Sequence, residues 1–213
     1  MYSLNPIRVG AVAAILAGVF IAGHGIPTMF DGNPGDLNSL ADYLTEIIFG
    51  AGYAALLILF VAFLRLRTKR GTNVYGRLGR VGAYAGVIGS VCIIVKTLLI
   101  VVLGATFGAQ AVKDLLVVIA GLYIAGTLFS SLLGPVLLGV DTLRIRVLPR
   151  WFGLALVVVP LALLIFQFIS STLAGYSPYV EGPFWIAIGY GLWSYRKASS
   201  AQEPVRARSA TVG

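Results

Sequence analysis

The segment Val81–Leu103, VGAYAGVIGSVCIIVKTLLIVVL, contains a single charged residue, Lys96. A bilayer core about 30 Å thick is crossed by an α-helix of about 20 mainly apolar residues, so this segment is long enough to cross a membrane. Its apolar residues form a continuous run, whereas the strands of a transmembrane β-barrel alternate apolar and polar residues. The sequence therefore predicts a membrane-spanning helix here.

Five further apolar segments flank this one and extend the prediction to the whole chain. Hydrophobic residues make up 58% of the 213 residues and charged residues only 11%, whereas soluble domains carry about 25% charged residues. We expect an all-α, polytopic transmembrane bundle of six helices that forms one domain over residues 1–197. The tail, residues 198–213, is rich in Ser, Ala and Arg and is predicted to be disordered. The predicted spans are residues 9–26, 44–64, 81–103, 115–140, 151–173 and 179–195.

The loops between the predicted spans alternate in charge, which predicts the orientation. Residues 65–80, RLRTKRGTNVYGRLGR, hold six basic residues and no acid, and fourteen of the sixteen basic residues of the chain fall on this side. The positive-inside rule makes this side cytoplasmic, so we expect both termini in the cytoplasm and the protein in a bacterial plasma (inner) membrane. Acidic residues cluster on or near the opposite side: Asp31, Asp36, Asp42, Glu46, Asp114 and Glu181.

The basic loops are short and face a membrane, so we expect the lipid bilayer as the partner of these charges and no nucleic acid. The first predicted span follows Arg8 and could be taken for a secretory signal. However, Ile21-Ala22-Gly23-His24-Gly25 is a poor cleavage site of the A-x-A type. We therefore expect the first span to remain as an uncleaved helix.

Small residues recur at helical spacing in three of the spans. In lipid there is little hydrophobic drive between helices, so close packing over such residues carries helix association. We expect contacts within the bundle, and the alternative is a face for a membrane-protein partner or a second copy of the chain. The residues are Gly10, Ala14, Gly18 and Ala22 in the first span, Gly82, Gly86 and Gly89 in the third, and Gly121 and Ala125 in the fourth.

Lys96 is the one basic residue within the outer half of a predicted span. It lies about 10 Å deep at 1.5 Å per residue, on the glycine stripe of its helix, so we expect it to point into the bundle. Glu46, near the outer end of the second span, is its expected partner. Two interpretations remain open. Either Lys96 binds an anionic or carbonyl group with Glu46 as counter-ion, or the two form a structural ion pair that closes a polar gap between helices.

Further polar residues are expected at the same level as this pair. His24 ends the first span, Asp42 shares a helical stripe with Glu46, Tyr123 lies in the outer half of the fourth span, and Gln167 in the outer half of the fifth. With the lysine and glutamate they form a candidate ligand or ion-pair site beneath an acidic mouth. A histidine there titrates near neutral pH, and the alternative is an interfacial histidine with its hydrogen bonds satisfied.

Familiar catalytic and metal-binding motifs are missing. The chain has one cysteine, Cys92, and one histidine, whereas metal and haem sites need clustered ligands. It has no P-loop and no Gly-x-Ser-x-Gly motif. We therefore expect no cofactor, no metal and no catalytic residues. Ser130 and Ser131 are expected to bond to backbone or to a neighbouring helix.

The element Leu148-Pro149-Arg150-Trp151-Phe152-Gly153 starts the fifth predicted span. It resembles the Leu-Pro-Arg-Trp-Leu-Gly element of some uncharacterised bacterial multi-span inner-membrane families. The resemblance implies a six-helix inner-membrane protein of unknown activity, and it carries over no functional residues. Physically, Pro starts the helix, Arg binds phosphates and Trp151 anchors at the interface, a role also expected of Trp185 and Trp193.

Three functions are open on these grounds. The favoured one is a non-catalytic integral membrane protein that is an accessory component of a larger membrane assembly, which an unpaired glycine stripe on the outer surface would support. The alternative is a small transporter or ligand-binding protein with an outward-facing polar cavity around Lys96 and Glu46, which takes a small anionic or lipidic ligand. A third, less favoured, is an intramembrane lipid enzyme that uses the same two residues.

Overall fold

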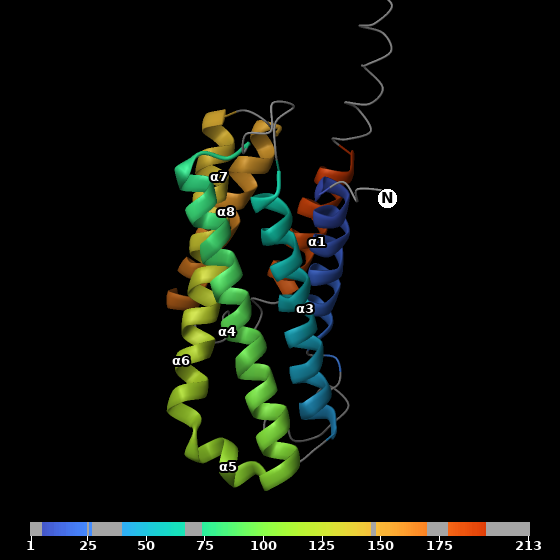
Figure 1. Cartoon of the computed structure of the whole chain (residues 1–213), viewed down its shortest axis with the longest axis vertical. Helices are drawn as coiled ribbons and strands as arrows, with labels where there is room; N and C mark the ends of the chain where they lie inside the picture. The colour runs from blue at the N-terminus through green and yellow to red at the C-terminus, as the bar shows by residue number, and fades with distance from the viewer. Residues whose placement is uncertain are drawn as a thin grey trace, which may run out of the picture.

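The structure is a computed structural model that describes residues 6–24, 26, 40–66, 74–145, 148–169 and 179–194, the side chains of 166–169 excepted. Every regular element in these ranges is helical, and the helices lie side by side in an elongated bundle (Figure 1). The elements are α1 (Pro6–Gly23), α3 (Leu40–Leu64), α4 (Arg77–Phe107), α5 (Ala109–Asp114), α6 (Leu116–Thr127), the π-helix η1 (Leu128–Leu133), α7 (Gly134–Ile145), α8 (Arg150–Ile169) and a helix over residues 179–194.

Four helices within the described ranges are long and apolar enough to cross a membrane. They are α1, α3, α4 and the continuous stretch Leu116–Ile145 that α6, η1 and α7 form together. Helix α8 is apolar over a shorter stretch, Arg150–Ile165. The predicted all-α class and its apolar helices are thereby confirmed, although four such helices are fewer than the six predicted spans. The predicted tail, residues 198–213, lies outside the described residues.

Three of the predicted spans are longer in the structure. The second was predicted over residues 44–64, but α3 starts at Leu40. The third was predicted over residues 81–103, but α4 starts at Arg77 and ends at Phe107. The fourth was predicted to end at residue 140, but α7 continues to Ile145. These helices extend beyond the apolar windows because polar residues at a helix end can reach water or lipid headgroups and need not end the helix.

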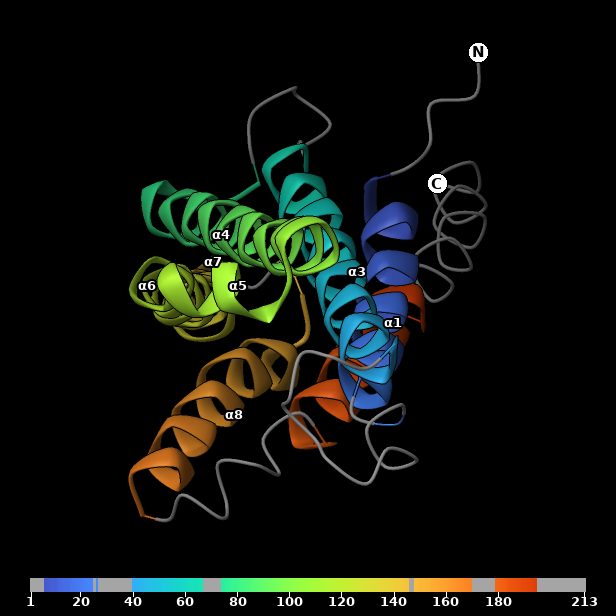
Figure 2. The ribbon, with the colours of Figure 1, turned by 90° about the horizontal axis from the view of Figure 1, so that it is seen from below.

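Helix α4 lies between two groups of helices. It packs against α3 on one side and against α6, η1 and α7 on the other, while α1 packs on α3 and α7 packs on α8. The short α5 joins α4 to α6 across one end of the bundle (Figure 1). Figure 2 shows α8 inclined away from α3 and α4. Pro160, Leu163 and Leu164 of α8 line a pocket.

Small residues bring the helices together inside the bundle, as predicted for α1 and α4. A Cβ atom added to Gly18 of α1 would collide with the backbone of Gly182, and one added to Gly89 of α4 would collide with the backbone of Ser130. The backbones are therefore in direct contact at both crossings. Gly121 of α6 differs, because a Cβ atom there would meet nothing within 4 Å.

The π-helix η1 ends at Leu133, two residues before Pro135, which is the second residue of α7. Proline has no N–H to donate to the carbonyl of Ser131, four residues earlier, so the α-helical hydrogen-bond ladder cannot continue through this turn. The hydroxyl of Ser130 donates to the Gly126 carbonyl at 2.6 Å and satisfies a backbone acceptor of the disturbed region. Single π-helical turns inside α-helices are frequent at functional sites.

Candidate functional site

A pocket of about 300 Å³ lies between α3, α6, η1, α8 and the helix over residues 179–194. Its walls are aliphatic and aromatic, and its polar groups are a few hydroxyls and one carboxylate. Small-molecule sites commonly combine apolar walls with a small number of placed polar groups. The lining residues are Phe49, Tyr53, Tyr123, Ile124, Thr127, Leu128, Ser131, Leu132, Pro160, Leu163, Leu164 and Glu181.

A chain of hydrogen bonds ends on the carboxylate of Glu181. The hydroxyl of Ser131 donates to Glu181 Oε1 at 2.8 Å, and Trp185 Nε1 donates to the same oxygen at 3.2 Å. The Tyr53 hydroxyl lies 3.1 Å from Ser131 Oγ. A serine hydroxyl has only one proton, and Ser131 gives it to Glu181, so Tyr53 is the donor to Ser131. The carboxylate is therefore held by residues of three helices.

Glu181 lies at half the depth of the bundle. Its partners Tyr53 and Ser131 are near the midpoints of α3 and of the stretch Leu116–Ile145, respectively. The sequence placed Glu181 with the acidic residues on or near the outer side, and the structure corrects that placement. An ionisable group at such depth in a membrane is costly and marks a functional site by default.

Lys96 points into the bundle, as predicted, and is 6% exposed. Its Nζ lies 2.5 Å from Glu46 Oε2, which is the geometry of the predicted pair. The same ammonium group lies 5.3 Å from the ring centre of Phe49 and 5.7 Å from that of Tyr123. Both rings line the pocket and Lys96 does not. The pair is thus next to the pocket but outside its wall.

The other residues of the predicted site are His24, Asp42 and Gln167. His24 Nδ1 donates to the Ile21 carbonyl at 2.7 Å, and its ring packs on Phe49 with centroids 5.0 Å apart. This geometry supports the interfacial interpretation of the histidine. Asp42 is buried on α3, one turn before Glu46. The side chain of Gln167 lies outside the described residues.

The sequence did not assign a site role to Phe49, Tyr53, Ser131, Glu181 or Trp185. A usable signal was present for the last two, because residues four apart lie on one face of a helix. Trp185 was expected at the membrane interface but is 1% exposed. Its indole N–H is bonded to Glu181, so it belongs to the core of the bundle.

Metal binding has no support in the described part of the chain, where no three His, Cys, Asp or Glu side chains gather. Cys92 is a free, half-buried thiol on α4. The polar groups that the described residues bring to the pocket are hydroxyls and a carboxylate.

Comparison of the chain with known proteins yields no matching family model, no matching curated protein and no matching solved structure.

Proposed function

We propose that this is a non-catalytic integral membrane protein that binds a small amphiphilic molecule in the pocket beside Glu181. The observation that carries the proposal is the pocket of about 300 Å³ whose apolar walls meet a carboxylate at half the depth of the bundle. Ser131 and Lys96 each already hold a polar partner. This arrangement supports binding in preference to catalysis.

The rim of the pocket supports entry from the bilayer. Tyr123, Ile124 and Leu128 line it and are 46%, 64% and 42% exposed. These residues lie on the outer surface of α6 and η1, which faces lipid in a membrane. A ligand that reaches the pocket from this side must first dissolve in the bilayer, so it needs an apolar body.

The accessory role favoured by the sequence has less support. Its expected signature was an unpaired glycine stripe on the outer surface, but the glycines of α1 and α4 pack against other helices of the same chain. Gly121 has open space around it, and a single glycine is not a stripe. The ligand-binding alternative also changes, because the polar residue at the proposed binding site is now Glu181 in place of Lys96 and Glu46.

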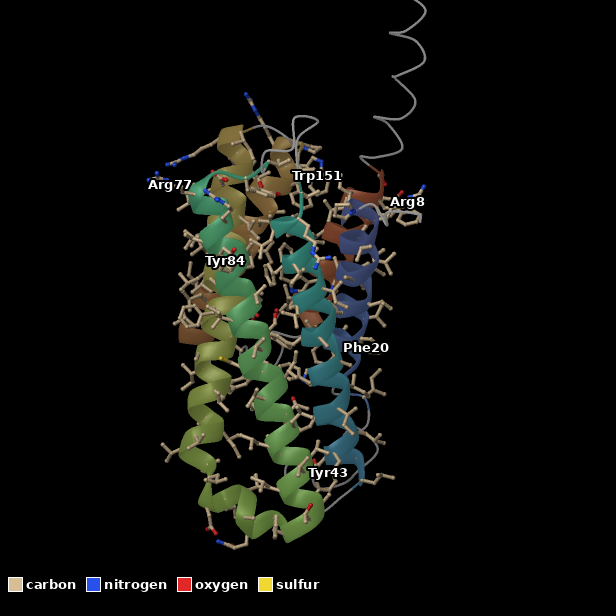
Figure 3. The ribbon with its side chains drawn as sticks, viewed as in Figure 1. Arg8, Phe20, Tyr43, Arg77, Tyr84 and Trp151 are labelled. Atoms are coloured by element: carbon tan, nitrogen blue, oxygen red, sulfur yellow. The ribbon has the colours of Figure 1, made fainter. Side chains whose placement is uncertain are left out.

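For the topology, the proposal is six membrane-embedded helical segments, the last of which begins at half the depth of the bundle, with both termini in the cytoplasm of a bacterium. Arg8 and Arg77 lie at one end of the bundle, and Tyr43 lies near the other (Figure 3). Trp151 is half exposed at the arginine end, and Arg8 lies 5.9 Å from the ring centre of Trp193. Arginine and tryptophan side chains together at that end of the bundle favour its placement in the lipid headgroups on the cytoplasmic side.

Mass spectrometry of the protein extracted with its own lipids tests the binding proposal. Thr127→Phe places a ring in the pocket wall, and Gly121→Phe adds the same ring to the same helix where space is open. We expect wild type and Gly121→Phe to retain one small molecule per chain and Thr127→Phe to lose it. Equal retention by all three proteins, or a stoichiometric protein partner with no small molecule, would contradict the proposal and favour the accessory role.

A further inference from the structure

We propose that the ligand of this pocket is an organic cation, a compact molecule with a positively charged nitrogen on an apolar body. This inference rests on the proposed function, because it names the chemical class that the same pocket takes. The first support comes from the charges around the pocket. Lys96 and Glu46 neutralise each other beside the pocket, whereas the partners that the described residues give Glu181 are a hydroxyl and an indole N–H, both uncharged.

A carboxylate without a positive partner inside a membrane is unfavourable in free energy. Ionised groups at depth are found paired with opposite charge or facing water, and a buried charge without a partner is strongly destabilising. A cation in the pocket would supply the missing charge next to Glu181. With a neutral ligand the carboxyl group would have to take up a proton or stay unpaired, and an anion would add repulsion to the carboxylate.

The aromatic residues of the pocket point to the same class. The rings of Phe49 and Tyr53 lie 4.8 Å apart between centroids, and those of Phe49 and Tyr123 lie 6.4 Å apart. The faces of such rings attract cations. The rings of Phe49 and Tyr123 already attract a cation here, because the Lys96 ammonium lies over both of them. The pocket wall therefore includes three aromatic rings and a carboxylate that can accept an ammonium ion.

The donors near the pocket do not favour an anionic ligand. Ser131 and Trp185 both direct their protons at Glu181, and Lys96 directs its charge at Glu46. The volume of about 300 Å³ is at the lower end of the range for drug-sized ligands. A compact lipophilic amine or quaternary ammonium ion fits this volume, whereas a whole phospholipid does not.

Two probes of the same shape test the charge directly. Benzyltrimethylammonium carries a fixed positive charge, and neopentylbenzene is its uncharged carbon isostere. Binding to the protein in lipid nanodiscs would be measured by equilibrium dialysis, with empty nanodiscs of the same lipid subtracted. We expect the cation to bind wild type about tenfold more tightly than the isostere, as contacts with several rings and a carboxylate imply.

Two variants assign the preference to one carboxylate. Glu181→Gln keeps an oxygen that accepts from Ser131 and Trp185, so we expect it to fold, to lose the tenfold preference and to bind the isostere as wild type does. Asp114→Asn removes an exposed carboxylate on α5 and is expected to keep the preference. The comparison of the two probes on wild type needs no variant, so a folding defect in Glu181→Gln would not prevent the test.

The outcomes separate the two proposals. Equal binding of both probes to wild type, or a cation preference that survives in Glu181→Gln, would overturn the organic-cation inference and leave the binding pocket in place. If neither probe binds and the extracted wild type carries no small molecule, the proposed function fails, and the inference fails with it.

Discussion

Ser131 donates a hydrogen bond of 2.8 Å to Glu181, joining the π-helical turn of η1 to the first turn of the helix over residues 179–194. The two residues are fifty positions apart in the chain. Their contact brings a hydroxyl from the disturbed turn before Pro135 to Glu181, the only carboxylate among the described residues that line the pocket. The π-helical turn of η1 therefore supplies the hydroxyl that binds the carboxylate at the polar end of the pocket.

Ser131→Ala is expected to lower the free energy of unfolding by about 1–3 kcal/mol, because a carboxylate oxygen and the Tyr53 hydroxyl both lose a partner. Thr127→Val is the matched control. Its hydroxyl bonds only to carbonyls of its own helix, so a change within about 0.5 kcal/mol is expected. Unfolding by SDS titration in mixed micelles measures both. Equal effects would show that the contact between Ser131 and Glu181 is not formed.

Lys96→Met is expected to cost about 3 kcal/mol of stability, because it leaves the half-buried Glu46 without its partner. Lys113→Met removes an exposed lysine and should change stability by less than about 0.5 kcal/mol. The double variant Lys96→Met with Glu46→Leu should recover most of the loss. Near-normal stability of Lys96→Met alone would count against a buried pair.

The same double variant distinguishes the two interpretations of Lys96. If the pair is structural, the double variant keeps the molecule that the wild-type pocket retains. Loss of that molecule, with stability recovered, would instead assign Lys96 and Glu46 to the binding site.

Gly89→Ala places a methyl group in the contact between α4 and η1, whereas Gly121→Ala places the same group on the open surface of α6. At Gly89 the added atom meets the backbone of Ser130, which cannot move aside, so a loss of about 1–3 kcal/mol is expected. At Gly121 nothing lies within 4 Å, and alanine should be neutral or stabilise by about 0.4–1 kcal/mol. Thermal unfolding in detergent compares them. Similar losses at both positions would mean that α6 is not oriented as described.

The proposed topology predicts which side of the membrane reaches two engineered cysteines. In a Cys92→Ser background, Lys113→Cys on α5 should react with a membrane-impermeant maleimide on intact bacterial cells. Arg77→Cys, at the start of α4, should react only after the cells are permeabilised. The reverse pattern would invert the orientation, and labelling of both from outside would contradict a span between them.

Sequence reasoning found those parts of the site that lie along single helices. Lys96 follows the glycine stripe of α4, so its inward direction could be read from helical periodicity, and Glu46 was the acidic residue at a matching depth. Tyr123 joins them as a ring beneath the ammonium group. These placements need only the spacing of residues along each helix and the depth of each helix in the membrane.

The pocket itself could not be read in the same way. Glu181 seemed to interrupt the start of the last span, because the sequence does not show that this helix begins at half the depth of the bundle. Ser131 faces Glu181 from η1, and a π-helical turn shifts the face that following residues present.

An experimental structure of the protein extracted with its own lipids tests the central claim most directly. We predict density for a small molecule between α6 and α8 that reaches the carboxylate of Glu181, with Ser131 and Trp185 still bonded to it. A bundle in which α8 closes against α6 and side chains fill the space beside Glu181 would contradict the account.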